Sequence, residues 1–401
     1  MNKTEKTIKL YPIYHAFTAD LVFFIPIDTL FLSHVKNLSA SEITFMNMFG
    51  LLVCIFFQKP VVKIAKKLGN LLSIRLGIVL LFISTLFLTF SNNIYGLLVY
   101  RLISEISVMF TSMFHIMIKH NLMAISRSED FVKTMNMGNI LYAVVTTITT
   151  LIGGYIYNFN NYFPLYITLA LLLGMFFVTY SFEEDEDVSD EILESDGSDF
   201  NKSKELIWIL IASSLFVAMY RIGQTNSKLF LQYDLEDSLS LDKVTIYMTY
   251  IMFISRIVRV TACALFTKMY RIFKLQIGNI MAVIHFVSFV LMLIGHFSNI
   301  FILKVTLISL GYFLILVVRD PYQTYAEDLI LRNTPKKHQQ QMIVKMEAYR
   351  KFVQLILNLS MTLVLLKYEL VVTQFIFLVL TFIEIFIHLK MVNTLKQKDA
   401  L

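Results

Sequence analysis

Runs of about 20 apolar residues recur along the whole chain, and this is the length that an α-helix needs to cross the hydrocarbon of a bilayer. We expect twelve such segments, near residues 11–33, 42–62, 71–91, 94–118, 131–156, 162–182, 205–230, 244–267, 273–296, 300–328, 341–365 and 369–390. Inside lipid every backbone polar group must be satisfied within the protein, which helices achieve on their own. The sequence therefore predicts an all-α membrane protein with twelve transmembrane helices.

The composition supports a membrane protein. Of the 401 residues, 57% are hydrophobic and only 16% are charged, whereas a soluble domain carries about 25% charged residues. The first apolar segment is long enough to span and is followed by no small-residue cleavage site, so we expect it to stay in place. Cys54 and Cys263 both lie in apolar segments, and we interpret them as packing residues.

The segment Glu183–Phe200 separates the twelve spans into two groups of six. It holds ten acidic residues and no basic one, which is too polar to pack and is typical of a disordered linker. We therefore expect an N-terminal six-helix bundle over residues 1–182, an acidic linker over 183–203, and a C-terminal six-helix bundle over 204–401.

The distribution of basic residues predicts the orientation. The net charge of +6 includes the acidic segment, and the rest of the chain has 35 basic residues against 19 acidic ones. If the N-terminus is inside, the outer loops hold only Lys36, Lys243 and Lys367. Positive loops face the cytoplasm, so we expect a plasma-membrane protein with both termini cytoplasmic. Cytoplasmic loops explain the excess of basic residues, so the excess does not indicate binding to nucleic acid.

Two short motifs accompany the division into six and six. The loop KPVVKIAKKLGNLLSIR has Gly69 within a basic cluster, and the fourth span opens with YRLISE, which contains Arg101. The whole arrangement resembles the major facilitator superfamily of secondary transporters. Lys66 stands where the family's loop has an aspartate, and Val62 where it has its first glycine. The resemblance implies two bundles that rock about a site lined by spans one, four, seven and ten.

A third segment, VVRDPYQTYAEDLILRNTPKKHQQQ, resembles a Gram-positive branch of that family. It contains adjacent opposite charges, Arg319 and Asp320, followed by Pro321, and we place them toward the cytoplasmic end of span ten. A proline kinks a helix, so these three residues are gating candidates. Gly69, in the cytoplasmic loop, is a fourth.

Ionisable residues inside spans are costly and therefore indicate function. At a rise of about 1.5 Å per residue, Asp28 and Arg101 fall at one depth, and Asp20 and Glu105 at a deeper one. We interpret these four as proton-coupling candidates, because a carboxylate changes its proton affinity when an arginine or a second carboxylate approaches or leaves. The alternative is that both aspartates are structural and bonded to neighbouring hydroxyls.

Substrate-binding candidates come from spans four and seven. Arg221 and Gln224 lie on span seven, where Arg221 can hold an anionic group or pair with Asp20 on span one. Met109 and Met113 repeat along span four and suit an adaptable apolar wall, although helix packing produces the same stripe. His115 lies between them and the cytoplasm; it either titrates or caps a buried hydroxyl.

Other charged residues in the C-terminal half receive structural interpretations. We expect Arg256 and Arg259 of span eight to be structural, because that span lies to the side of the cavity in the resembled fold. Glu384 and His388 are four apart near the inner end of span twelve. We expect them to form an interfacial pair.

The preferred hypothesis is a secondary transporter that exports an amphipathic or cationic small molecule in exchange for protons and acts as a monomer. The alternatives are uptake or facilitated transport of a polar or anionic metabolite, lipid translocation, and a non-transporting protein on a transporter scaffold. No metal-ligand spacing, nucleophile constellation or phosphate-binding glycine loop appears in the sequence. We therefore expect no enzyme activity, no metal and no cofactor.

Overall fold

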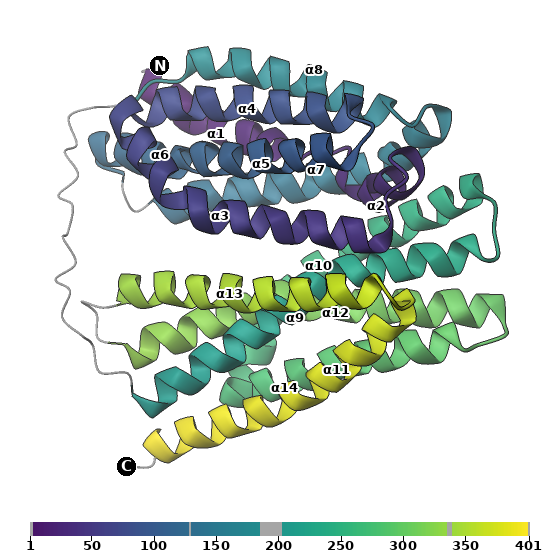
Figure 1. Ribbon diagram of the computed structural model, residues 1–401. Coiled ribbons are helices and arrows are strands. Elements are labelled where there is room, and N and C mark those ends of the chain that lie inside the picture. The colour runs from purple at the N-terminus through teal and green to yellow at the C-terminus, as the bar shows by residue number, and fades with distance from the viewer. Residues whose placement is uncertain (1–2, 128–129, 185–202, 335–338, 400–401) are drawn as a thin grey trace. The chain divides into compact units, whose positions relative to one another are not determined.

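The computed structural model describes residues 3–127, 130–184, 203–334 and 339–399, and its regular elements in these ranges are helices (Figure 1). The chain divides into two compact units. The first contains the elements from α1 to α8 together with Thr245–Arg256, and the second contains the rest of the elements from α9 to α14. The predicted linker over 183–203 lies outside the described residues except for its ends.

The first unit is built around long helices that pack in pairs, α4 against α5, α3 against α5 and α1 against α7. Its elements are α1 Lys3–Thr18, η1 Ile25–Ile27, α2 Asp28–Leu30, η2 Phe31–Val35, α3 Ala40–Leu68, α4 Asn70–Phe90, α5 Ile94–Thr111, α6 Met113–Ala124, α7 Phe131–Phe159, α8 Phe163–Val178 and η4 Thr179–Ser181. The fourth predicted span is thus two helices, α5 and α6, that meet at Ser112.

The second unit is arranged around α9, which packs against α12, α13 and α14. Its elements are α9 Lys204–Glu236, α10 Leu241–Phe273, η5 Lys274–Gln276, α11 Ile277–His296, α12 Phe301–Asn333, α13 Gln339–Leu365 and α14 Leu370–Asp399. Within the described ranges, ten helices are long and apolar enough to cross a membrane. The broken segment Lys3–Val35 and the more polar α13 correspond to the other two predicted spans.

The first predicted span is not one continuous helix, and Pro26 accounts for the break. A proline lacks the N–H that would bond to the carbonyl four residues earlier; here that is the carbonyl of Val22. The chain leaves the helix after Thr18 and resumes at Ile25. The Thr149 hydroxyl of α7 donates to the Val22 carbonyl oxygen at 3.0 Å, so the freed acceptor is satisfied by a neighbouring helix.

The beginning of the acidic segment is bound to the first unit. The backbone N–H of Glu183 donates to the Thr7 hydroxyl at 2.9 Å. The Glu184 carboxylate accepts from the backbone N–H of Leu71 at 3.2 Å and from the Asn70 side chain. A carboxylate at this position satisfies unpaired N–H groups in the first turn of α4 and interacts favourably with the helix dipole.

Arg319 and Asp320 lie in the middle of α12 and not toward its end. The helix continues from Phe301 through Pro321 to Asn333, and the predicted position toward the cytoplasmic end of span ten stays a prediction. Pro321 is tolerated within the helix because neighbouring groups can satisfy the backbone that it frees.

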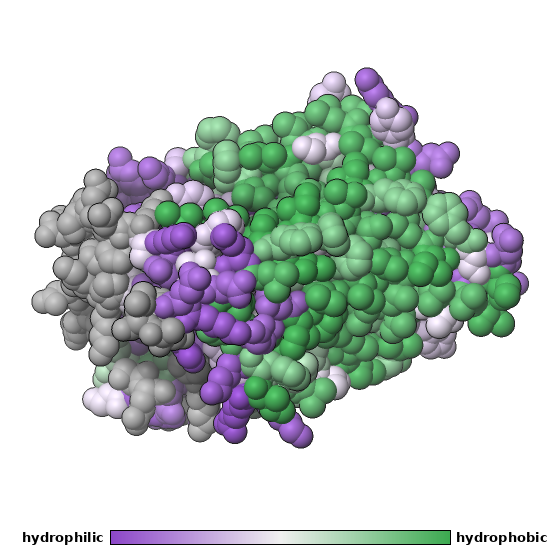
Figure 2. Space-filling view, turned by 90° about the horizontal axis from the view of Figure 1, so that it is seen from below, coloured by the Kyte–Doolittle hydropathy of each residue, from purple (hydrophilic) through white to green (hydrophobic). Residues whose placement is uncertain are grey.

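The surface matches the surroundings that the sequence predicts. Figure 2 shows a broad hydrophobic area between hydrophilic ends on the face that carries α14. On that helix Phe375, Val379, Phe382 and Phe386 are each 45–59% exposed. Their spacing of three and four residues places them along one side of the helix. A stripe of this kind suits contact with lipid chains and would promote aggregation in water.

The hydrogen bond from the Thr149 hydroxyl to the Val22 carbonyl oxygen is expected to stabilise the break in the first span. Thr149→Val keeps the shape and removes the donor, which leaves a buried carbonyl unsatisfied and costs about 1–3 kcal/mol. Thermal unfolding of the purified protein should show a lower midpoint for Thr149→Val, and Thr149→Ser should restore most of the loss. Equal midpoints for Thr149→Val and wild type would show that the bond does not hold the break.

Candidate functional site

Asp20 lies in the break between α1 and η1, on the surface of the first unit. One carboxylate oxygen accepts from the backbone N–H of Leu21 at 3.2 Å, and the other from the Tyr142 hydroxyl of α7 at 3.3 Å. The predicted depths of Asp20 and Asp28 required one straight helix, and that requirement is not met in this span. A carboxylate at a helix break has two neutral donors here and remains accessible to a proton.

Arg101 and Glu105 form an ion pair along α5. The Arg101 Nη2 atom lies 2.8 Å from Glu105 Oε1, and the Cys54 thiol of α3 donates to Glu105 Oε2 at 3.5 Å. Arg101 also interacts electrostatically with Asp20. We call Asp20, Tyr142, Arg101, Glu105 and Cys54 the acid centre.

Asp28 was predicted to pair with Arg101. The Asp28 carboxylate accepts from the backbone N–H of Thr29 at 2.6 Å, at the start of α2. The pairings of Asp28 with Arg101 and of Asp20 with Glu105 stay predictions.

His115 belongs to a cluster of aromatic and imidazole rings in the first unit. Its ring centroid is 6.1 Å from that of His15 and 6.2 Å from that of Tyr11. His15 in turn lies 6.1 Å from the ring of Tyr142, and its Nε2 atom is 3.2 Å from Asn139 Oδ1. Because Tyr142 also contacts Asp20, titratable rings extend from His115 to the acid centre.

Met109 and Met113 pack within the first unit. Both are partly buried against a cluster formed by Val61, Ala65 and Phe110. Met113 also contacts the larger core that contains Phe114. These contacts favour the packing interpretation of the stripe over a substrate wall.

The second unit brings together side chains from four helices. Arg221 of α9 donates from Nη1 to Gln354 Oε1 of α13 at 3.5 Å, and its Nη2 atom lies 4.0 Å from Glu347 Oε2. The other oxygen of Glu347 bonds to Arg350 Nη1, one turn along α13. One carboxylate is therefore shared between two guanidinium groups.

A second set of contacts joins α9, α12 and α10. Arg319 Nη1 donates to Gln224 Oε1 at 2.9 Å, and Arg319 Nε lies 3.6 Å from Asp320 Oδ1. Asp320 forms a bidentate pair with Arg259, whose Nη2 donates to Oδ1 at 3.1 Å and whose Nε bonds to Oδ2. The Cys263 thiol contacts the same carboxylate at 3.7 Å.

We call these two sets the arginine track. It consists of Arg221, Gln224, Arg259, Arg319, Asp320, Glu347, Arg350 and Gln354. In the ion pairs given above for the described residues, four guanidinium groups share two carboxylates. Guanidinium charge within membrane helices is costly unless an anion balances it.

Arg350 is the most buried member of the track. Its side chain is fully inaccessible to solvent, and within the described ranges its Nε and Nη2 atoms have no hydrogen-bond partner. Burying a charged donor without a partner costs more than burying a neutral one. The two unpaired donors therefore mark a position that an acceptor would stabilise.

The gating candidates lie in two parts of the structure, within α12 and at the junction of α3 and α4. Asp320 is fixed by Arg259, and Pro321 follows it within α12. Gly69 forms the single-residue junction between α3 and α4, where its φ of +78° favours glycine. Backbone geometry at this junction is sufficient to account for the glycine.

A further buried polar group lies in the core of the second unit. His285 Nδ1 of α11 is 3.0 Å from Glu384 Oε2 of α14, and both side chains are fully buried. His388 Nδ1 donates to the Glu384 carbonyl at 2.9 Å, so its Nε2 accepts from the Tyr322 hydroxyl at 2.6 Å. The expected interfacial position of Glu384 and His388 was wrong, because both are fully buried against His285 of α11 and Tyr322 of α12.

Sequence reasoning missed several members of these groups. The structural role predicted for Arg259 stays a prediction, and its pairing with Asp320 was not expected. Glu347, Arg350 and Gln354 lie within α13 and within the predicted span 341–365, and nothing in the sequence indicated that they meet Arg221. His15 lies four residues after Tyr11, and this spacing, which places both rings on one side of a helix, could have indicated it.

Comparisons with known proteins identify the family. The model of the Major Facilitator Superfamily matches residues 10–356, and the chain belongs to this family. It is a secondary transporter of the superfamily type and not an enzyme. A search of curated proteins finds no match.

Solved structures show the same fold. The nucleoside transporter NupG superposes with a TM-score of 0.78 at 14% identity, covering 98% of this chain and 99% of that one. A bacterial metal transporter gives 0.69 at 11% identity, with 98% of both chains covered. The xylose transporter XylE from E. coli gives 0.65 at 13% identity, with 97% and 95% covered. The prediction of an all-α, major-facilitator-like membrane protein is confirmed.

The pair between Arg259 and Asp320 should couple strongly, because it is bidentate and only 25–30% exposed. A double-mutant cycle with Arg259→Gln and Asp320→Asn should give a coupling energy of about 1–3 kcal/mol in thermal or denaturant unfolding.

The matched control is the ion pair between Arg332 and Asp328, which both lie on α12. Its arginine is 64% exposed, so Arg332→Gln with Asp328→Asn should give a coupling energy below about 1 kcal/mol. Similar coupling for the two pairs would mean that the mid-helix pair contributes no more than a surface contact.

Proposed function

We propose that this transporter moves a polar, negatively charged metabolite whose anionic group binds the arginine track, and that Asp20 carries the coupled proton. The observation that carries the proposal is Arg350, a fully buried guanidinium with two unpaired nitrogens beside Arg221 and Glu347. A carboxylate or phosphate accepts from guanidinium donors in a charge-assisted, often bidentate geometry.

The charge balance supports an anionic substrate over the cationic one first predicted. Arg221, Arg259, Arg319 and Arg350 share the carboxylates of Asp320 and Glu347, and Gln224 and Gln354 add neutral groups for hydrogen bonds with the rest of a polar substrate. NupG and XylE are named as transporters of a nucleoside and of xylose, which are polar metabolites. Nucleosides and xylose are uncharged, so those names support a polar substrate and not its negative charge.

Proton coupling rests on the acid centre. Asp20 is accessible, sits at a helix break and accepts only from Leu21 and Tyr142 among its hydrogen-bond donors in the described residues. Glu105, in contrast, is held by Arg101 and Cys54. A carboxylate paired with arginine already has a cationic partner, so we assign the exchangeable proton to Asp20 and a positioning role to Arg101 and Glu105.

One observation favours the alternative, proton-coupled export of a cationic or amphipathic molecule. Asp20 and the ring cluster of Tyr11, His15, His115 and Tyr142 offer an acidic group beside aromatic faces, a combination that attracts cations. In that case the arginine track would be structural, and its neutralisation would leave transport intact.

Proteoliposomes with an interior pH dye separate the two hypotheses. Carboxylates, phosphates and amines of similar size are added one at a time to wild type, Asp20→Asn, Arg221→Gln and Arg350→Gln. We expect an anion-driven proton flux that Asp20→Asn abolishes. Arg221→Gln and Arg350→Gln should raise the half-saturating anion concentration about 10- to 100-fold, as the loss of a charged hydrogen bond predicts.

The control is Arg127→Gln, because Arg127 is an exposed arginine paired only locally with Asp130. It should leave both the flux and the half-saturating concentration unchanged. A flux driven by amines and insensitive to Arg221→Gln and Arg350→Gln would overturn the proposed substrate class. A flux of anions without protons, unchanged in Asp20→Asn, would overturn the assignment of the proton.

A further inference from the structure

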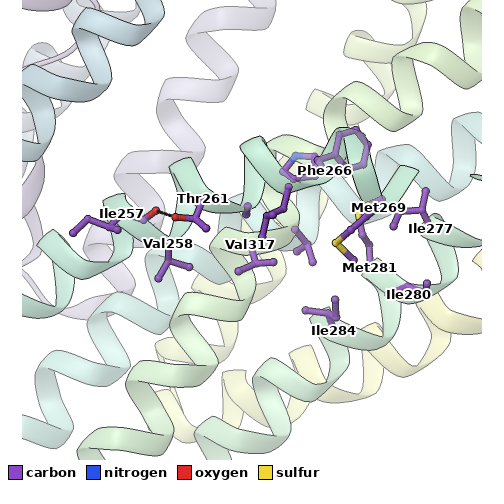
Figure 3. A pocket seen from close by; sticks show the side chains of 14 residues that line it. Ile257, Val258, Thr261, Phe266, Met269, Ile277, Ile280, Met281, Ile284 and Val317 are labelled. Carbon is purple, nitrogen blue, oxygen red and sulfur yellow. Dashed lines mark hydrogen bonds between the residues drawn. The ribbon is translucent and has the colours of Figure 1, made fainter. Parts of the chain in front are cut away.

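An apolar cavity of about 290 Å³ lies among α10, α11 and α12 of the second unit (Figure 3). Ile257 and Val258 lie at one end of it, and Met269 and Ile277 lie at the other. Its one lining hydroxyl, that of Thr261, donates to the carbonyl of Ile257 at 2.9 Å. The cavity therefore presents hydrocarbon to its contents and suits an apolar chain.

A second cavity, of about 820 Å³, lies at the turn that joins α10 to α11. It is lined by four basic residues, Arg271, Lys274, Arg332 and Lys396, and by no acidic one. Arg332 pairs with Asp328, at 2.9 Å. Within the described ranges, the other three basic residues form no ion pair, and their charges are available to an anion.

The two cavities follow each other along the same elements. Met269 and Ile277 line the apolar one, and Tyr270 to Gln276, between them in sequence, contribute to the basic one. On α12, Pro321 lines the first cavity and Arg332 the second. Eleven residues are close to three full helical turns, so these two positions share one side of α12 and are separated by about 17 Å along its axis.

Tyr325 lies between them on that side of α12 and fixes the turn. Its hydroxyl donates to the carbonyl of Leu275 at 3.0 Å. A side chain at Gly278 would come within 2.7 Å of the Tyr325 hydroxyl, so the glycine permits this approach. The apolar and basic cavities are thus held at a fixed separation.

We propose that an anionic phospholipid occupies these cavities, with an acyl chain in the apolar one and its phosphate among Arg271, Lys274 and Lys396. The separation of about 17 Å is close to the hydrocarbon thickness of one leaflet, about 15 Å. The loop charges assign this end of the helices to the cytoplasm, where anionic lipids and basic pockets between helices meet. This site is independent of the arginine track and of the proposed substrate.

A single tryptophan at Leu265, which lines the apolar cavity, reports lipid binding. The chain's natural tryptophan, Trp208, is first changed to Phe, and Leu265→Trp is reconstituted with phospholipids whose acyl chains are brominated. We expect brominated phosphatidylglycerol to quench this tryptophan at a lower mole fraction than brominated phosphatidylcholine. Each of Arg271→Gln and Lys274→Gln should reduce that preference about fivefold.

Two controls distinguish a specific site from general lipid contact. Phe386→Trp, on the exposed side of α14, should be quenched equally by both lipids. Lys243→Gln, in the opposite predicted loop, should keep the preference at Leu265→Trp. Equal quenching by both lipids at Leu265→Trp would overturn the proposal. So would full displacement of the brominated lipid by millimolar inorganic phosphate, because the basic cavity would then bind a soluble anion.

Discussion

An ionised side chain inside a bilayer requires a partner of opposite charge, and the second unit depends on this requirement. Arg259 and Asp320 meet halfway along α10 and α12 and neutralise each other. Without that pair, Asp320 would retain the longer contact to Arg319, at 3.6 Å, where hydration is poor. The pair fixes the two helices in register, and the remaining arginines of the track are positioned by the same packing.

The two units differ in which charged group keeps hydrogen-bonding capacity for a ligand. In the first unit, Arg101 is occupied by Glu105, and Asp20 accepts from neutral donors while the charge of Arg256 also acts on it. In the second unit, Arg350 retains unpaired nitrogens although Glu347 bonds to it. A transporter that moves a proton together with an anion needs a carboxylate that can take the proton and a guanidinium that can bind the anion. This complementarity is the reason for preferring an anionic substrate.

The sequence was sufficient for the class of fold, because twelve apolar segments joined by alternately basic loops are compatible with few architectures besides a helical membrane bundle. It also located Asp20, Arg101, Arg221 and Arg319 as charges in spans. It could not show their partners, because partners come from distant helices: Tyr142 for Asp20 and Gln354 for Arg221.

Depth counting along ideal helices was the weakest part of the sequence reasoning. Pro26 interrupts the first span, and a hydroxyl from α7 compensates for the lost bond. The local sequence pattern predicts neither the length of the break nor the hydrogen bond from Thr149 of α7. Likewise the sequence did not show that α12 continues through Pro321 to Asn333, which places Arg319 and Asp320 near the middle of the helix.

The class of substrate that the arginine track recognises can be measured by equilibrium binding to the purified protein. Compounds are compared in matched sets that share one scaffold and differ only in a carboxylate, a neutral amide or an amine at one position. The account predicts that the carboxylate member binds at least about tenfold more tightly than its amide, a difference of about 1.4 kcal/mol. Tighter binding of the amine member would contradict it and assign recognition to the acid centre.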